Sequence, residues 1–388
     1  MRTIPLGELV TIKGGGTPDK SVSAYWDGPI PWASVKDFKS IEITKTTDTI
    51  TMDGVNNSAT NIIPAGAILV PTRMAVGKAA INTIDLAINQ DIKALFPKLN
   101  LYTRYLLHIL LANSSKLEDQ ASGATVKGIT LDTLKAIEIP LPPLDEQKRI
   151  AAILDQADEL RRLRQRAINR LNELGQAIFY EMFIEGESQS WPLKKVADVA
   201  VQTRTGPFGS QLLHSEFVDS GIAVLGIDNA VQNEFHWGGQ RFITSEKYRQ
   251  LQRYTVHPDD VLITIMGTCG RCAIVPEGIP TSINTKHLCC IALDKLQMLP
   301  HFLHAAFLQH PAILNQLGSQ AKGAVMPGLN MGIIRALEIR VPPLQLQHEF
   351  SQKITNLKQI QDASSIHAAN LTSFFLALQH RAFCGELQ

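Results

Sequence analysis

Residues 138–144 read EIPLPPL and residues 338–344 read EIRVPPL, so one short motif recurs after 200 positions. The correspondence extends backwards to the glycine-containing stretches at 123–129 and 323–329, and forwards along the apolar positions that follow each motif. A period of this length is far longer than that of a solenoid repeat. The sequence therefore predicts two copies of one module, each occupying about half of the chain.

Each copy is expected to end in one long helix. A Pro-Pro pair cannot continue a helix but is a natural start for one, and residues 145–183 and 345–383 contain no proline. Apolar residues recur through these segments about every 3.6 positions, which is the spacing of a helical stripe. Such a stripe needs a partner, and the antiparallel helix of the other copy is the expected one. The residues predicted to pack between the two helices are Ile150, Leu154, Ala157, Leu160, Leu171, Leu174, Ile178, Phe350, Ile354, Leu357, Ile360, Leu371, Phe374 and Leu378.

The remainder of each copy is expected to be a mixed α/β domain. Short β-branched runs such as 67–70 and 261–265 are separated by Gly and Pro, and a helical stretch at 102–113 interrupts them. The predicted fold class is α+β, with two mixed α/β domains separated by two long antiparallel helices that form a coiled-coil spacer in a tandem pseudo-two-fold repeat. The predicted boundaries are 1–137 and 187–337 for the two domains, and 138–186 and 338–388 for the two helical segments.

The composition is that of an ordinary globular protein. The 388 residues are 45% hydrophobic and 19% charged, with a net charge of +1, so any nucleic-acid surface would have to be a local basic patch. No apolar run approaches the ~18 residues of a membrane span, and residues 1–7 do not form a secretory signal. Five cysteines do not make a disulfide framework, so the reducing cytoplasm is the expected location.

Three stretches carry a resemblance to a known family. Residues 139–155 (IPLPPLDEQKRIAAILD) are similar to the central helical region of type I restriction–modification specificity subunits. Residues 26–32 (WDGPIPW) resemble the start of their target recognition domains, and residues 123–129 (GATVKGI) resemble a segment near a domain's end. The resemblance implies a subunit without catalytic activity and without a cofactor or metal ion of its own. Each recognition domain would read one half of a bipartite, gapped double-stranded DNA target, and the helices would set the gap.

The resemblance also implies partner proteins. Two methyltransferase subunits, which bind S-adenosylmethionine and methylate adenine, would dock on the helices and adjoining surfaces. Restriction subunits that use ATP and Mg²⁺ would join the same core, and no membrane is involved. The second copy departs from the family pattern, since Leu346 and Phe350 stand where the first copy has Glu146 and Ile150.

Motifs for chemistry of its own are incomplete. The prolines at 142–143 lack the preceding Asn or Asp and the following aromatic residue of an amino-methyltransferase. The pair Gly77-Lys78 is not a P-loop, because Thr72 stands where Gly is required and Ala79 where Ser or Thr is required. No catalytic residue is predicted.

Two metal-site alternatives remain open. Cys269 and Cys272 precede the pair Cys289-Cys290, but adjacent cysteines on a strand point to opposite faces, so buried thiols are favoured over zinc. His301 and His304 have a spacing that could chelate a metal, but a solvated helix face is the favoured interpretation.

The predicted DNA contacts are basic and amide side chains in loops, which suit phosphates and major-groove base edges. Lys78 and Arg271, in matching glycine-containing turns, are the preferred phosphate contacts. The basic run at 161–166 is either a solvated helix face or a DNA contact between the half-sites. The predicted set is Lys13, Lys36, Arg73, Lys78, Asn89, Gln90, Lys127, Arg204, Gln211, Asn229, Arg241, Arg271, Asn284, Lys286 and Lys322.

A structural adaptor is the alternative function. In that hypothesis the paired helices recruit partner proteins and the two domains bind protein ligands. A steep fall of duplex affinity with salt would favour the DNA-binding hypothesis.

Overall fold

The computed structural model describes residues 2–98, 100–123, 126–186, 189–318 and 329–387. The chain forms two compact units, which are described separately below. Unit 1 consists of Met1–Gln165 together with Ile366–Gln388, and unit 2 consists of Arg166–Ser365. The predicted domains and helical segments are each continuous in sequence, whereas each compact unit combines residues from both halves of the chain.

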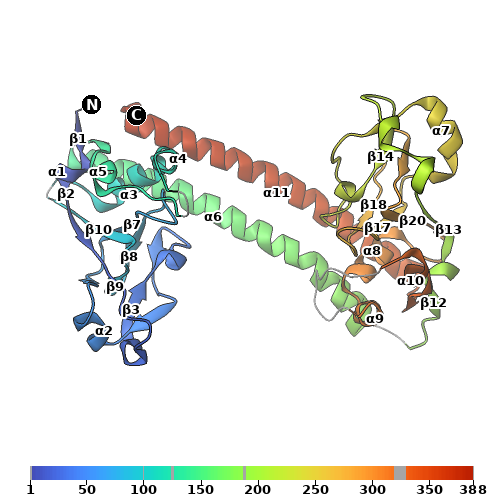
Figure 1. Cartoon of the computed structure of the whole chain (residues 1–388), viewed down its shortest axis with the longest axis horizontal. Coiled ribbons are helices and arrows are strands. Elements are labelled where there is room, and N and C mark those ends of the chain that lie inside the picture. The colour runs from blue at the N-terminus through green and yellow to red at the C-terminus, as the bar shows by residue number, and fades with distance from the viewer. Residues whose placement is uncertain (1, 99, 124–125, 187–188, 319–328, 388) are drawn as a thin grey trace. The chain divides into compact units, whose positions relative to one another are not determined.

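Unit 1 contains two mixed sheets and a small antiparallel pair (Figure 1). The five-stranded sheet has the order β2 (Val10–Gly14), β10 (Ile92–Pro97), β7 (Ile68–Pro71), β8 (Ala80–Asn82) and β4 (Glu42–Ile43). The four-stranded sheet has the order β5 (Asp48–Ile50), β3 (Trp26–Ala33), β9 (Leu86–Ile88) and β6 (Ile62–Ile63), and β1 (Thr3–Pro5) pairs with β11 (Glu138–Pro140). The helices are α1 (Leu6–Leu9), α2 (Met52–Asn56), α3 (Thr103–Ala112), α4 (Ser114–Asp119), α5 (Leu131–Lys135) and the beginning of α6 (Leu144–Tyr180).

Unit 2 repeats this plan. One four-stranded sheet has the order β13 (Ala200–Thr205), β20 (Leu288–Leu293), β17 (Val261–Thr264) and β18 (Cys272–Ile274). The other has the order β15 (Phe242–Ile243), β14 (Ile222–Leu225), β19 (Ser282–Asn284) and β16 (Thr255–Val256), and β12 (Leu193–Lys195) pairs with β21 (Glu338–Arg340). The helices are α7 (Ser245–Leu251), α8 (Pro300–Gln309), α9 (Pro311–Gln316), α10 (Met331–Ala336) and the beginning of α11 (Leu344–Cys384).

The central strands are buried on both faces because they lie between two layers. All four residues of β7 and all four of β17 are buried. Side chains alternate along a strand, so Ile68 and Val70 pack towards α3 and α6, while Leu69 packs towards Phe38 in the other cluster. This arrangement explains why these strands are continuous apolar runs in the sequence.

One buried glutamine fastens each long helix to the domain that precedes it. The Gln147 side chain is fully buried; its Oε1 accepts from the Tyr102 amide at 2.8 Å and its Nε2 donates to the Pro142 carbonyl at 2.9 Å. Gln347 makes the matching bonds with the Leu299 amide at 2.8 Å and the Pro342 carbonyl at 2.8 Å. These pairs establish which residues of the two copies are equivalent.

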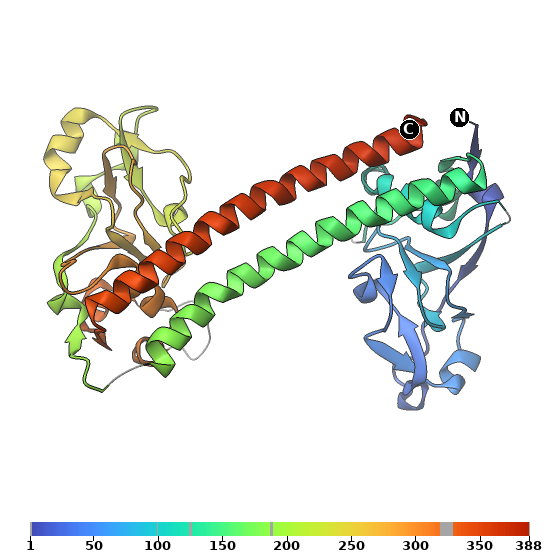
Figure 2. The same cartoon turned by 180° about the vertical axis from the view of Figure 1, so that it is seen from behind.

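The two long helices pack antiparallel in each unit (Figures 1 and 2). In unit 1, the Arg149 guanidinium donates to the Leu387 carbonyl, and Arg161 lies 5.2 Å from the centroid of the Phe375 ring. Phe375 and Ala382 of α11 belong to the hydrophobic core of unit 1. Residue numbers thus rise along α6 in the direction in which they fall along α11, so the two helices are antiparallel.

The same exchange completes unit 2. Phe179 and Phe183, at the end of α6 and in the turn that follows it, belong to the core of unit 2, and the Phe179 ring lies 5.7 Å from that of Phe350. The Gln361 side chain donates to the Leu171 carbonyl at 3.2 Å. Each helix therefore begins on its own copy and ends in the core of the unit that contains the other.

The predicted fold class of two mixed α/β domains with two long packed helices is confirmed. Within the described ranges, no helix is long and apolar enough to cross a membrane.

The predicted packing residues fall into three groups. Ile150, Leu154, Phe350 and Leu357 are buried, and the half-buried ones are Ala157, Leu171, Ile178, Ile354, Leu371 and Leu378. Leu160, Leu174, Ile360 and Phe374 are 57%, 44%, 53% and 57% exposed, so the neighbouring helix covers these four side chains only in part. The reason is that residues with polar side chains, among them Asp158, Arg161 and Gln361, occupy inward positions near the middle of the helices.

Candidate nucleic-acid interface

In unit 1, the structure brings three predicted DNA-binding residues together at the ends of β7, β9 and the loop before α5. Arg73 forms a β-bridge with Gly128, and the Met74 amide donates to the Lys127 carbonyl at 3.1 Å. The Thr72 amide donates to the Asp91 carbonyl at 2.7 Å, which places Gln90 beside Arg73. We call Arg73, Gln90, Lys93 and Lys127 the unit 1 basic cluster.

Arg73 and Lys127 are exposed, whereas the Gln90 side chain accepts a hydrogen bond from the Thr17 hydroxyl and donates one to the Asp91 carboxylate at 3.3 Å. Arg73 is 56% exposed, and its only described ion pair is a long one of 3.8 Å to Asp91. Lys93 donates to the Gln90 carbonyl at 2.8 Å. Burial lowers the pKa of Lys93, while the Asp91 carboxylate acts in the opposite direction. Lys93 was not predicted; the signal that could have found it is its place on a strand directly after the Asn89–Asp91 turn.

In unit 2, Arg241, Lys286 and His287 lie together. Burial, and then the positive charges of Lys286 and Arg241, lower the pKa of His287, so its imidazole is neutral at pH 7. Arg241 pairs with Asp228 at 2.5 Å, and a hollow of about 300 Å³ is lined by both Arg241 and the exposed ring of Trp237. We call Arg241, Lys286 and His287 the unit 2 basic cluster.

The two clusters share one equivalent position, which is Gln90 before β10 in unit 1 and Lys286 before β20 in unit 2. Pro71 pairs with Ile92 in unit 1, and Thr264 pairs with Leu288 in unit 2. Counting from these pairs, Arg73, Gln90 and Asp91 correspond to Met266, Lys286 and His287. The scaffold is therefore shared, while the side chains that it presents differ.

A glycine in each copy lets a loop approach the turn that follows β9 or β19. A Cβ on Gly15 would lie 2.1 Å from the Ile88 carbonyl oxygen, and one on Gly206 would lie 2.0 Å from that of Asn284. Both contacts are impossible for a larger residue, so the glycine is required at each position. The Gly14–Gly16 run thus has a structural role.

Four of the residues predicted to contact DNA are buried and hydrogen-bonded inside their units. Arg204 is 8% exposed and pairs with Asp260 at 2.7 Å. These bonds hold the side chains inward, and moving them outward would leave the buried polar groups of their partners unpaired. The others are Asn89 with the Asp91 amide, Asn229 with the Gly226 amide and Asn284 with the Leu288 carbonyl.

The remaining predicted residues lie outside the two clusters. The Lys13 ammonium lies 5.6 Å from the centroid of the Phe96 ring, a cation–π contact. Lys36 forms an ion pair with Asp48 at 3.9 Å, and the Gln211 side chain accepts a hydrogen bond from the Tyr254 hydroxyl. Lys78 is exposed and donates to the Phe38 carbonyl at 3.2 Å, whereas Arg271 lines a cavity of unit 2. Lys322 lies outside the described residues.

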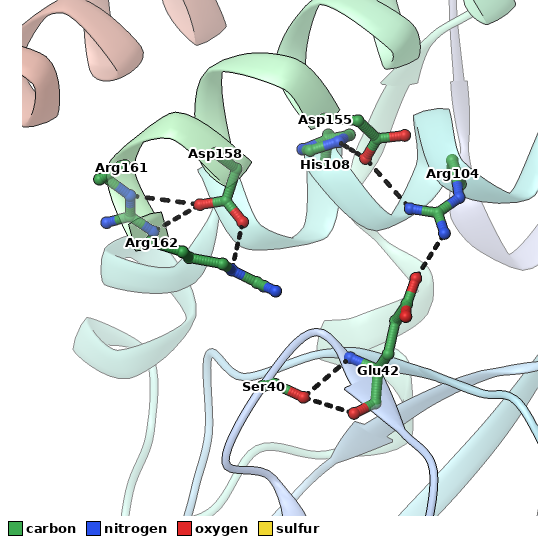
Figure 3. A network of polar contacts seen from close by, with 8 residues as sticks. All are labelled: Ser40, Glu42, Arg104, His108, Asp155, Asp158, Arg161 and Arg162. Carbon is green, nitrogen blue, oxygen red and sulfur yellow. Dashed lines mark hydrogen bonds and ion pairs between the residues drawn. The ribbon is translucent and has the colours of Figure 1, made fainter. Parts of the chain in front are cut away.

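A polar network fastens the edge strand β4 of unit 1 to α3 and α6 (Figure 3). Arg104 of α3 bridges Glu42 and Asp155, and His108 Nε2 lies 2.9 Å from the same carboxylate. Burial would raise the pKa of Asp155, but His108 and Arg104 outweigh it and hold that pKa below its ordinary value. None of these residues was singled out by the sequence.

The first two residues of the basic run of α6 are engaged with an acidic neighbour. Arg161 and Arg162 pair with the buried Asp158 at 2.7 and 2.8 Å (Figure 3). The bonds to Asp158 fix both guanidinium groups against the helix.

Four cysteines of unit 2 are buried, and His301 and His304 are half-buried. Cys269, Cys272, Cys289 and Cys290 are buried, and burial raises the pKa of Cys289 to about 12. A thiol in that state is a poor metal ligand, because the thiolate is the ligating form. The described residues hold no group of three or more His, Cys, Asp or Glu that could bind a metal. His301 and His304 line a cavity, so their predicted place on a solvated helix face is wrong.

Comparison with known proteins gives a consistent result. The chain matches the type I restriction modification DNA specificity domain over residues 1–173 and 191–367. It is 25% identical to the type I restriction enzyme MjaIX specificity subunit of Methanocaldococcus jannaschii, over 94% of this chain and 90% of that protein. It is 35% identical to the EcoR124I/EcoR124II specificity subunit of Escherichia coli over 40% of each chain.

Solved structures share the fold. The S subunit of a type I restriction–modification system from M. genitalium superposes with a TM-score of 0.58 and 18% identity, covering 98% of this chain and 96% of that one. A chain from a study of the assembly and conformational transition of a type I system gives a TM-score of 0.63 at 16% identity, covering 100% and 98%.

Replacing Arg204 with alanine should lower the free energy of unfolding by about 3–5 kcal/mol, because Asp260 would be left buried and unpaired. Arg73→Ala is the matched control, since it removes an exposed guanidinium and should change stability by less than about 0.5 kcal/mol. Urea denaturation followed by circular dichroism measures both. Equal losses in the two variants would contradict the assignment of Arg204 to the core.

Proposed function

The chain belongs to the type I restriction modification DNA specificity family, and from this premise we propose how its two units divide the reading of DNA. It is a non-catalytic specificity subunit that recognises DNA targets, which replaces the adaptor alternative. We propose that unit 1 reads one half of a bipartite target and unit 2 reads the other. The family carries no cofactor itself, so S-adenosylmethionine, ATP and Mg²⁺ are expected on partner subunits.

One observation carries this proposal: the two units present different side chains on the same scaffold. Arg73 and Gln90 suit guanine and adenine edges or phosphates, whereas the equivalent Met266 and Lys286 do not offer the same donors and acceptors. Two domains that share a fold but present different side chains are suited to two half-sites of different sequence. Because its target is cellular DNA, we place the protein in the cytoplasm.

Within each unit, the basic cluster is the proposed DNA contact. In unit 1 the exposed Arg73 and Lys127 lie on neighbouring loops, so both can reach one duplex without moving buried groups. In unit 2 the proposed contacts are Arg241 and Lys286, which both lie near His287. Lys13, Lys36, Lys78 and Gln211 are proposed only as outlying contacts.

Arg73→Gln should weaken binding to a target duplex and make the slope of log K against log salt less negative by about one, because one phosphate contact is lost. Lys116→Gln is the matched control, since Lys116 is an exposed lysine on α4. Fluorescence anisotropy at several salt concentrations measures the slope. An unchanged slope for Arg73→Gln would exclude Arg73 from the interface.

The division of labour is tested by exchanging residues 1–137 for the corresponding domain of another specificity subunit. Genome-wide adenine methylation should then show one altered half-site, while the other half-site stays the same. Deleting the gene is the control and should abolish methylation at the whole gapped motif. Alteration of both half-sites would refute the modular proposal, and persistence of the motif after deletion would refute the function.

We further propose that the exposed apolar residues of the helices dock methyltransferase subunits, and that restriction subunits join the resulting core. In unit 1, Leu160 and Leu163 of α6 are 57% and 48% exposed. On α11, Ile366, Phe374 and Leu376 are 62%, 57% and 58% exposed. Large apolar side chains left on helices are typical of a surface that a partner covers.

Leu160→Glu should weaken association with the methyltransferase subunit about tenfold or more, because a charge would be buried at the contact. Gln156→Glu places the same charge on an exposed polar position of α6 and should leave association unchanged. Titration of the labelled partner measures both affinities. If the two variants behave alike, this helix surface is not the docking site.

A further inference from the structure

Unit 2 contains a cavity of about 500 Å³ that the proposed DNA reading does not use. Its walls come from the end of α6, from α8, from the start of α11 and from residues 232–234. Arg271, His301 and His304 supply the polar side, while Phe307, Phe350 and Ile354 supply the apolar side. Its size falls in the range of about 300–1,000 Å³ that is typical of small-molecule sites.

The equivalent place in unit 1 is occupied by side chains. The glutamine bonds make Tyr102 equivalent to Leu299, so Arg104 corresponds to His301 two residues later along each helix. By the same count, His108 corresponds to Ala305. Arg104 and His108 meet Asp155 and fill the space between α3, α6 and β4 (Figure 3).

In unit 2, shorter side chains leave this network unformed. His301 replaces the arginine, Ala305 replaces the histidine, and Thr355 replaces Asp155, eight residues after the glutamine in both copies. Of these three residues of unit 2, His301 and Ala305 line the cavity.

Arg271 gives the cavity its chemical character. Among the described residues its guanidinium has no hydrogen bond or ion pair, although the residue is half-buried. The one acidic side chain on the wall, Glu234, is already paired with Lys358 at 2.6 Å. A planar guanidinium without a partner is a good match for a phosphate or carboxylate group.

We propose that this cavity binds a small phosphorylated molecule of about nucleotide size. Its phosphate group contacts Arg271 and His301, and its body lies against Phe307, Phe350 and Ile354. The backbone of duplex DNA is a poorer occupant, because the site is concave and has a volume of about 500 Å³. Lys78, the equivalent of Arg271 in unit 1, is exposed and donates to the Phe38 carbonyl, so it does not reproduce the unpaired guanidinium of Arg271.

The test is calorimetric titration of the full-length chain with adenosine 5′-monophosphate, with adenosine and with inorganic phosphate. The monophosphate should bind about tenfold or more tightly than either of the other probes, because only it uses both sides of the cavity. Arg271→Gln should weaken its binding about tenfold or more. Lys78→Gln is the matched control and should leave it unchanged.

A second variant keeps the test decisive if Arg271→Gln does not fold. Ala305→Leu fills the cavity without touching Arg271 and should also weaken binding of the monophosphate. The proposal is overturned if no probe binds, if inorganic phosphate binds as tightly as the monophosphate, or if Lys78→Gln has the same effect as Arg271→Gln. Displacement of the monophosphate by a duplex of unrelated sequence would assign Arg271 to DNA instead.

Discussion

The structure depends on two buried glutamines. Gln147 and Gln347 are fully buried. The side-chain amide of each accepts a hydrogen bond from the backbone just before α3 or α8, and donates one to the backbone of the Pro-Pro turn before the long helix. A buried amide must keep its hydrogen bonds, so the direction in which each helix leaves its domain is fixed by a few bonds. The proline pair and the glutamine thus act together, since the first starts the helix and the second orients it.

From these fixed starts, each helix ends in the core of the other unit. Phe179 and Phe183 complete the core of unit 2, and Phe375 and Ala382 complete that of unit 1. The ends of the helices therefore carry most of the burial, while most positions between them are half-buried or exposed. This explains why polar residues such as Asp158 are tolerated at inward positions there, and why large apolar residues such as Leu160 remain exposed.

Duplication left the scaffold alike and let the surfaces diverge. The same glycine approach, at Gly15 and Gly206, holds the loops against the same turns, because no larger residue fits. Residues on those turns are free to differ, as Gln90 and Lys286 do. The two units also differ next to the long helices. Unit 1 has an ionic network there, and unit 2 has a cavity at the corresponding place.

The sequence by itself determined the repeat, the two long helices and the family, because these depend on local signals: a proline pair, an apolar period and short motifs. Tertiary structure alone decided that Arg204 is a core residue and Arg73 a surface one, although both are arginines near strands. It also decided which face of each helix is covered. The physical reason is that burial depends on which distant segments meet: Arg73 joins Lys127 and Arg204 meets Asp260 only after the chain has folded.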